Sequence, residues 1–197
     1  MTDNNKALFK LQNLPRVLYI NLDDHTDRRK YMEEQFSYWD ITKFNRISAQ
    51  DGRGDNDLGD TLKGTYPKSM SSGEVGCVTS HLKAMKFWLE NSDDTEKYCL
   101  IMEDDCDVST ATHWGFTWRQ FVSALPYHWD VIQLAVINPI EVHMRLHHRF
   151  VNDFSTACYL ISRRHARKLV EMHCRGEYYK LDQNVKPRAV ADDLIYN

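Results

Sequence analysis

The stretch Tyr98-Cys99-Leu100-Ile101-Met102-Glu103-Asp104-Asp105 decides the fold, because a short apolar run passes directly into consecutive acids. A continuous apolar run of this length is typical of a strand that is buried on both faces of a parallel sheet. In open α/β sheets, ligands bind beyond the carboxyl ends of the strands. The stretch therefore predicts a buried strand over 98–102 with a binding site directly after it.

Further strands and helices alternate along the chain on both sides of this stretch. Apolar runs predict the strands, and amphipathic patterns between caps and breakers predict the helices. We expect strands over 17–22, 131–136 and 156–161, and helices over 27–36, 71–91, 114–124 and 164–173. This alternation indicates an α/β fold with a mixed, mainly parallel sheet flanked by helices. The 197 residues are the size of one domain, which we assign to 1–197.

Composition and charge argue against several classes of protein. The net charge of -3 does not favour nucleic acid as a partner, and no apolar run reaches the roughly 20 residues of a transmembrane helix. The start of the chain, 1–6, is polar and lacks the apolar core of a secretory signal. The five cysteines form no CxxC pair, so the spacing indicates neither a disulfide framework nor a zinc site. We expect a reduced, cytoplasmic protein.

Acids gather at the end of the central strand, where Glu103, Asp104, Asp105 and Asp107 follow one another closely. Such acids repel one another unless a cation or hydrogen-bond donors compensate. Mg²⁺ and Mn²⁺ prefer carboxylate oxygens, and they often bind one or two carboxylates together with substrate phosphates. The cluster therefore favours a metal site, although a solvated turn that caps the next helix would have the same composition.

Ordered segments along most of the chain resemble glycosyltransferase family 25, which includes lipopolysaccharide and collagen galactosyltransferases. They are similar to the family's INLD…DRR, R-x-x-A-x-D-G, GE-x-GC-x-x-SH and LEDD motifs and to its late strand. The segments are Val17–Asp23 with Asp27-Arg28-Arg29, Arg46–Gly52, Ser72–His81, Leu100–Asp105 and Thr156–Ser162. Each match alone is weak, but the ordered set is specific.

The resemblance implies a Rossmann-like, A-type glycosyltransferase fold and a metal-dependent, inverting transfer. The donor would be a UDP-sugar carrying galactose or glucose, and the metal would be Mn²⁺ or Mg²⁺. The acceptor hydroxyl would belong to a glycan, to a lipid-linked sugar such as lipopolysaccharide, or to a hydroxylysine-type protein. By similarity, Asp105 is the first choice as metal ligand, with Glu103 and Asp107 as further ligands. Glu103 and Asp104 would otherwise contact the ribose or base of the donor.

The resemblance also implies donor contacts outside the acidic cluster. Asn21-Leu22-Asp23 ends the first strand, where the nucleotide base would lie. Arg28 and Arg29 are candidates for the diphosphate because guanidinium groups match phosphate oxygens, although a solvated helix surface explains at least one of them equally well. Gly73 lies at a helix start whose free N–H groups could meet an anion. His81 lies on the same helix, as a site residue or as a satisfied core histidine.

An inverting transfer needs a carboxylate that takes the proton of the acceptor. Asp192 and Asp193 are candidates, because the family has a similar acidic element near its end. Glu74 is another candidate, but its position also suits a capping box at the helix start. Asp130 stays open as a further base. Since the chain stops at Asn197, shortly after the acidic pair, we expect either a minimal member or a chain shortened at its C-terminus.

Two other functions remain open from the sequence. A non-catalytic relative would keep the fold and act as a module that binds nucleotide sugars or glycans. A nucleotidyltransferase, or another enzyme that handles phosphates, would fit the acids but not the ordered motifs. The sequence does not determine the oligomeric state.

Overall fold

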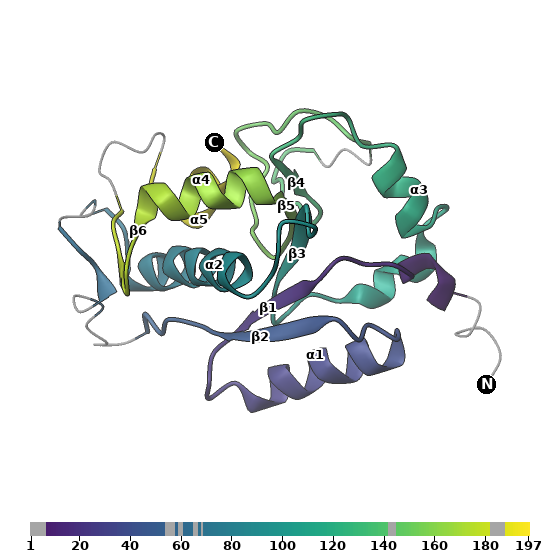
Figure 1. The fold of residues 1–197 in the computed structure, drawn as a ribbon, viewed down its shortest axis with the longest axis horizontal. Coiled ribbons are helices and arrows are strands. Elements are labelled where there is room, and N and C mark those ends of the chain that lie inside the picture. Colours follow the sequence, from purple (N-terminus) through teal and green to yellow (C-terminus); the bar gives the residue numbers. More distant parts are fainter. Residues whose placement is uncertain are drawn as a thin grey trace.

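The computed structural model describes residues 7–53, 58, 61–64, 67, 69–141, 145–181 and 188–197. Figure 1 shows a central sheet with α1 on one face and α2, α4 and α5 on the other. The strands of this sheet are β1 (Val17–Asn21), β2 (Phe44–Ser48), β3 (Tyr98–Glu103), β4 (Val131–Gln133) and β5 (Cys158–Ser162). The helices are α1 (Thr26–Tyr38), α2 (Ser72–Glu90), α3 (Trp118–Ser123), α4 (Arg163–His173) and α5 (Ala191–Tyr196). Shorter elements are the 3₁₀ helices η2 (Leu8–Leu11) and η4 (Val108–His113) and the strand pair β6 (Cys174–Arg175) and β7 (Tyr178–Tyr179).

The strand order of the sheet is β2-β1-β3-β5-β4. β1 pairs in parallel with β2 and β3, whereas β5 pairs antiparallel with β3 and β4. All strands of this sheet except β5 therefore run in the same direction, which confirms the expected α/β fold with a mixed, mainly parallel sheet. The connections from β1 to β2 and from β2 to β3 pass over opposite faces, through α1 and α2. An open α/β sheet leaves a crevice beyond its strand ends at such a switch point.

The strands β1 and β3 are buried because both of their faces are covered. In β1, Leu18 and Ile20 pack on the side of α2 and α4, whereas Val17 and Tyr19 pack on the side of α1. Successive side chains of a strand point to opposite faces, so a strand between two helical layers needs apolar residues at every position. This explains why the apolar runs carry no polar residue until the strands end.

Several elements differ from the sequence expectation. The sequence did not predict β2, because this edge strand buries only Ile47 and its other side chains are partly exposed. It did not predict the short helix α5 either. The helix expected over 114–124 is shorter, since Thr117 and Gln120 form a capping box that starts α3 at Trp118. The strand expected over 131–136 ends at Gln133.

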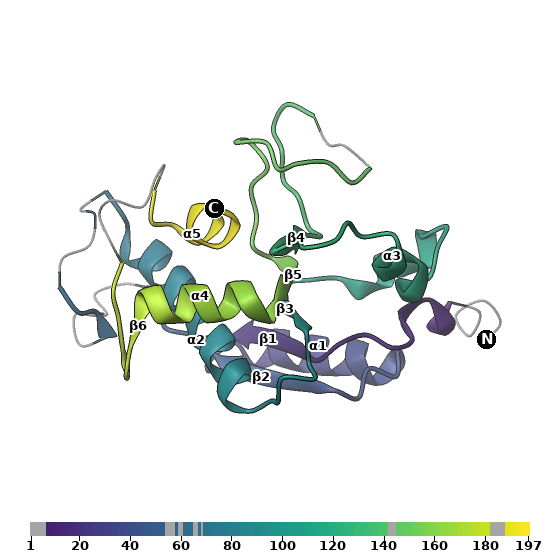
Figure 2. The ribbon, with the colours of Figure 1, turned by 45° about the horizontal axis from the view of Figure 1, so that its top comes forward.

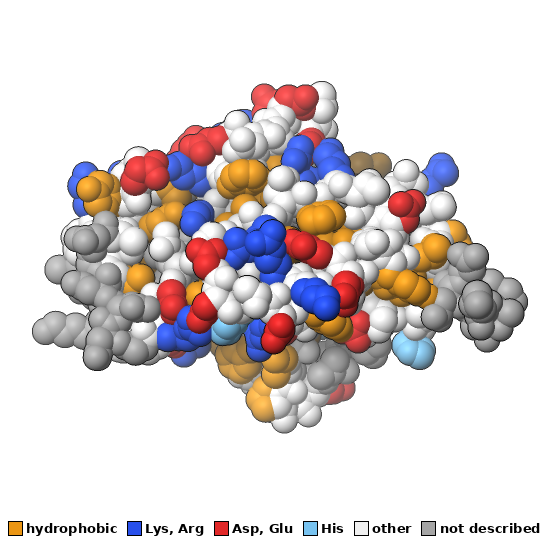
Figure 3. Space-filling view, turned by 90° about the horizontal axis from the view of Figure 1, so that it is seen from below, with side chains coloured by type: hydrophobic (Ala, Val, Ile, Leu, Met, Phe, Trp, Pro, Cys, Tyr) orange, Lys and Arg blue, Asp and Glu red, His pale blue; other side chains and the backbone are white. Residues whose placement is uncertain are grey.

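The face that carries α1 bears mixed charge, with basic and acidic side chains intermingled (Figure 3). Arg29 pairs with Glu33 and Lys30 with Glu34, each one helical turn apart. Exposed pairs of this kind contribute little to stability, because solvent screens them. The basic residues at the start of α1 therefore alternate with acids and form no continuous basic patch on this face.

The connection from β4 to β5 projects away from the sheet, as its described residues 134–141 and 145–157 show (Figure 2). Because β5 is antiparallel to β3 and β4, this connection starts and ends on the side of the sheet where β1 and β3 have their carboxyl ends. Among the described residues, no helix combines the length and the apolar composition needed to cross a membrane.

Candidate functional site

A cleft of about 220 Å³ opens beyond the carboxyl ends of β1, β2 and β3. Its walls are the turn after β1, the segment after β2, the first half of α2 and the end of β3. Of the residues that the sequence assigned to the donor, those that line it are Leu22, Arg28, Gly73, His81, Glu103 and Asp104. Four of the five segments that resemble family motifs therefore meet at the switch point of the sheet.

Asp104 is held at the end of β3 by hydrogen bonds from two sides. Asn21 Nδ2 donates to one carboxylate oxygen at 2.7 Å, and Arg28 Nη1 donates to the other at 2.8 Å. Asn21 Oδ1 in turn accepts from Arg46 Nε at 2.8 Å, so the network extends to β2. Asn21 and Asp104 are both buried. Asp104 therefore joins the ends of neighbouring strands and fixes the guanidinium of Arg28 at the cleft.

Asp105 is exposed, whereas Asp104 is buried. Its side chain is 53% exposed, and Oδ2 lies 3.6 Å from Arg28 Nη1. Asp107 turns away from both, since it accepts the backbone N–H of Ser109 at 2.8 Å and lines a second cleft on the α1 side. Asp105 is consequently the acid that stands beside Arg28 with its oxygens accessible.

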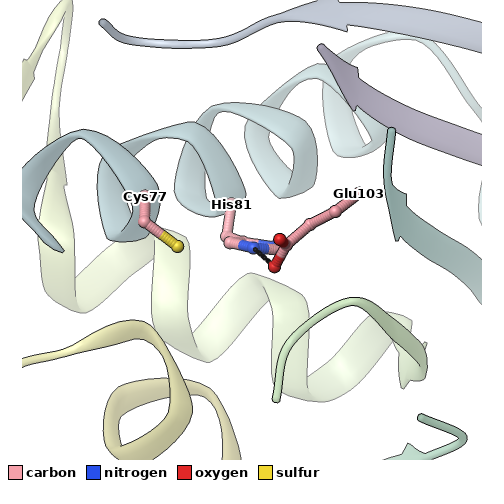
Figure 4. A group of neighbouring side chains, drawn as sticks. All are labelled: Cys77, His81 and Glu103. Atoms are coloured by element: carbon pink, nitrogen blue, oxygen red, sulfur yellow. Dashed lines mark hydrogen bonds and ion pairs between the residues drawn. The ribbon is translucent and has the colours of Figure 1, made fainter. Parts of the chain in front are cut away.

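His81 is buried and lines the cleft. Its ring points from α2 toward Glu103 (Figure 4). Its Nε2 lies 3.3 Å from Glu103 Oε1, and its Nδ1 lies 3.0 Å from the hydroxyl oxygen of Tyr159. The hydroxyl of Thr156 donates to the same Glu103 oxygen at 2.7 Å. Burial by itself lowers the pKa of His81, but contacts with Cys77 and Glu103 raise it to about 9. His81 is therefore part of the core and also faces the cleft.

The segment after β2 lies directly against the start of α2, because two glycines permit the approach. A Cβ on Gly52 would lie 1.9 Å from the carbonyl oxygen of Ser72, and a Cβ on Gly76 would lie 2.7 Å from that of Gln50. The backbone N–H of Gln50 also donates to Ser80 Oγ at 2.8 Å. Gly52 belongs to the family-like segment 46–52, and Gly76 belongs to the segment 72–81. The close contact between these two segments requires both glycines.

Gly76→Ala is expected to destabilise the protein by about 1–3 kcal/mol. The added methyl group would overlap with backbone atoms, which cannot rotate away as a side chain could. The loss should outweigh the better helix propensity of alanine. Gly73→Ala is the matched control on the same helix, since the nearest atom to its Cβ would be Ser71 Oγ at 4.0 Å. Thermal unfolding followed by circular dichroism compares the two variants. Equal Tm values would contradict the close approach.

Arg53 is a cleft residue that the sequence reasoning missed. Its Nη2 lies 2.7 Å from an oxygen of Asp51 and 2.8 Å from one of Asp24, and its Nη1 lies 2.9 Å from His25 Nε2. These hydrogen bonds hold the pKa of Asp51 well below its usual range. Arg53 therefore joins the turn after β1 to the segment after β2. The family-like segment 46–52 ends one residue before it, which is the signal that could have found it.

Three residues assigned to the donor from the sequence do not line the cleft. Asn21 is buried, and its amide binds Asp104. Arg29 pairs with Glu33 at 3.0 Å on the surface of α1. Asp23 accepts from Ser48 Oγ at 2.9 Å and is ion-paired with Arg46, which lies on the edge strand β2. Of the two arginines at the start of α1, only Arg28 faces the cleft.

Glu74 and Asp130, which the sequence left open as bases, have structural partners. Glu74 accepts the backbone N–H of Ser71 at 2.8 Å and completes the capping box of α2. Asp130 precedes the amino end of β4, whereas the cleft lies beyond the carboxyl ends of the strands. It pairs with Arg164 at 2.7 Å. Of the candidate bases, Asp192 and Asp193 near the C-terminus remain.

The acidic pair near the C-terminus lies at the start of α5. Asp192 Oδ1 accepts the backbone N–H of Ser155 at 2.5 Å, and Ser155 has a φ of 103°, in the left-handed region. Asp193 is buried, and its oxygens lie 3.6 Å from Arg149 Nη2 and 3.3 Å from Arg188 Nε. Because the residue after Ser155 is the threonine that binds Glu103, this segment links the start of α5 to the end of β3.

The mixed sheet, its switch point and the cleft beyond three strand ends define a Rossmann-like α/β protein. The model of glycosyltransferase family 25, described as an LPS biosynthesis protein, matches residues 15–184, and the chain belongs to this family. The family expected from the motifs is thereby confirmed. The chain is also 36% identical over 101 residues to "Putative glycosyltransferase R655" of Acanthamoeba polyphaga mimivirus. This match covers 48% of the chain and 29% of the viral protein.

Proposed function

We propose that the chain transfers galactose or glucose from a UDP-sugar to a hydroxyl of a glycan, lipid-linked or protein acceptor, with inversion and with Mn²⁺ or Mg²⁺. Membership of family 25 supports sugar transfer. The observation that carries the proposal is the arrangement at the switch point, where buried Asp104 fixes Arg28 and exposed Asp105 stands beside it. This arrangement offers a cation held at the cleft and an accessible carboxylate beside that cation.

The lining of the cleft suits a nucleoside diphosphate. Arg28 and Arg53 approach it from different walls, and guanidinium groups form paired hydrogen bonds with phosphate oxygens. Gly73 lies in the first turn of α2, where free N–H groups and the helix dipole favour an anion. Ile20 and Leu22 provide apolar surface for the base or ribose.

The residues fit a hard divalent ion at Asp105. Among the described residues no hydrogen-bond donor holds its half-exposed carboxylate, and Mg²⁺ or Mn²⁺ often takes such a ligand together with substrate phosphates. Glu103 is less available, because His81 and Thr156 contact its Oε1. Such an ion, when bound, would neutralise charge on the departing diphosphate.

The transfer also needs a proton acceptor. A bond forms between the acceptor oxygen and the anomeric carbon, while the bond from this carbon to the diphosphate oxygen breaks. The electron pair of the broken bond leaves with UDP, and the acceptor proton passes to a carboxylate. Asp192 suits this role better than Asp193, because Asp193 is buried and paired with two arginines. The Ser155 N–H holds Asp192 by Oδ1, which leaves Oδ2 for the acceptor.

Calorimetric titration with UDP-galactose and UDP-glucose tests the donor site. We expect binding in the presence of Mn²⁺, loss of binding with EDTA, and no comparable binding of GDP-mannose. Release of UDP on adding an acceptor would then distinguish a transferase from a module that only binds nucleotide sugars. Absence of binding of either UDP-sugar to the folded chain with Mn²⁺ would contradict the proposed function.

A further inference from the structure

A thiol, an imidazole and a carboxylate converge in the lining of the cleft. Cys77 and His81 lie one turn apart on α2, and Glu103 reaches them from the end of β3 (Figure 4). The potential ligand atoms of the three side chains all lie within 4.8 Å of one another. No other trio of histidine, cysteine and acidic side chains in the described part of the chain comes as close.

Two of these side chains are oriented by partners outside the trio. The hydroxyl of Tyr159 lies 3.0 Å from His81 Nδ1, so a proton on Nδ1 can be donated to it, and Nε2 then presents its lone pair to Glu103. Thr156 holds Glu103 through a hydrogen bond of 2.7 Å. Outer partners of this kind fix the ring and the carboxylate of metal ligands, and their loss typically weakens metal binding 10- to 100-fold.

One tautomer of His81 leaves a place for a positive charge between the members of the trio. In the tautomer with the proton on Nδ1, the lone pair of His81 Nε2 faces a carboxylate oxygen at 3.3 Å, where the two repel unless a cation lies between them. A proton would satisfy these two groups alone. The thiol of Cys77 adds a sulfur atom to the nitrogen and oxygen of this pair, and the three together form a donor set for a metal.

We propose that Cys77, His81 and Glu103 bind a zinc-class divalent cation, distinct from the hard ion proposed at Asp105. Zn²⁺ takes thiolate, imidazole and carboxylate ligands, whereas Mg²⁺ and Mn²⁺ prefer oxygen ligands. Bond lengths of about 2.0–2.3 Å in a tetrahedral site place ligand atoms about 3.6 Å apart. The pair His81 Nε2 and Glu103 Oε1 already has such a spacing, so a modest rotamer adjustment closes the site.

The proposed ion would have three protein ligands and an open fourth position. All three side chains line the cleft, so this position faces the space where a water molecule or a phosphate oxygen can enter. The spacing of the cysteines did not indicate this site. Cys77 and His81 form a C-x-x-x-H pair, and their third partner comes from a different element 22 residues later.

The test uses Zn²⁺ alone, so it does not depend on the proposed sugar transfer. We expect one Zn²⁺ per chain by calorimetry, and a rise in Kd on the order of 100-fold in Cys77→Ser, which loses a direct ligand. Cys174→Ser is the matched control, because Cys174 lies on β6 outside the trio. Co²⁺ should give the near-ultraviolet thiolate charge-transfer band in the wild type and in Cys174→Ser, but not in Cys77→Ser.

A second measurement on the wild type avoids any effect of the substitution on folding. Saturating Zn²⁺ is expected to protect Cys77 from alkylation by iodoacetamide, as read by mass spectrometry of its peptide. The proposal is overturned if Cys77 reacts equally with and without Zn²⁺. It is also overturned if Zn²⁺ binding is absent in the wild type, is unchanged in Cys77→Ser, or is lost in Asp105→Ala while Cys77→Ser retains it.

Discussion

Asp105→Ala is expected to abolish the Mn²⁺-dependent binding of UDP-sugars and to lower turnover by at least about 100-fold. The proposed metal would stabilise the charge on the departing diphosphate by several kcal/mol, and each 1.36 kcal/mol corresponds to a tenfold change in rate. Because Asp105 is exposed and makes no hydrogen bond among the described residues, its loss should leave the Tm nearly unchanged. Calorimetry with and without Mn²⁺, together with a UDP-release assay, measures both effects.

Asp107→Ala is the matched control for this prediction. It removes one negative charge from the same acidic run, but from a residue that caps η4 and lines the second cleft. We expect a stability loss of about 1 kcal/mol from the missing cap and little change in donor binding. If Asp107→Ala removes the metal dependence and Asp105→Ala does not, the ligand assignment is wrong.

Asp192→Asn is expected to lower kcat by about 10²- to 10⁴-fold, the usual contribution of a positioned general base. The amide keeps Oδ1 as an acceptor, so the backbone N–H of Ser155 stays bound and the segment before β5 keeps its position. Donor affinity should therefore stay close to the wild-type value. Turnover with saturating donor, measured beside calorimetric donor binding, separates the two quantities.

Asp193→Asn should show the opposite pattern. The carboxylate of Asp193 is buried beside Arg149, whose Nη2 is buried and has no hydrogen-bond partner among the described residues. Removing the charge leaves that guanidinium without its anionic neighbour, so we expect a lower Tm. A fall in kcat for Asp193→Asn at unchanged Tm, with Asp192→Asn fully active, would reverse the assignment of the base.

Much of the fold could be predicted from the sequence because its central strands are covered on both faces. The apolar runs of β1 and β3 are typical of buried strands, and the start of α2 carries its capping signal at Ser71 and Glu74. β2 could not be predicted, since a partly exposed edge strand has no apolar run and is defined by its pairing with β1. The sequence also could not predict that β5 is antiparallel to its neighbours, because the direction of a strand depends on the side of the sheet from which the chain enters it.

The site could be predicted only to the level of its segments. The sequence indicated that the ends of several strands would meet, and the structure brings them to one cleft. It could not say which of two adjacent residues faces that cleft, because a single step around a helix separates Arg28 from Arg29. Nor could it indicate Cys77, whose role depends on a carboxylate from another element. Such choices depend on side-chain direction, which motifs do not record.

The reversed strand β5 has a practical consequence for engineering. The connection from β4 to β5 starts and ends on the same side of the sheet. Both of its ends are anchored, because β4 pairs with β5 and β5 pairs with β3. Loop-closure entropy grows slowly with length, so an insertion far from these ends costs little. A reporter peptide or fluorophore placed in 134–141 or in 145–152 would therefore lie beyond the same strand ends as the cleft, while β1 and β3 keep their pairing. These two segments are candidate attachment points for an optical reporter.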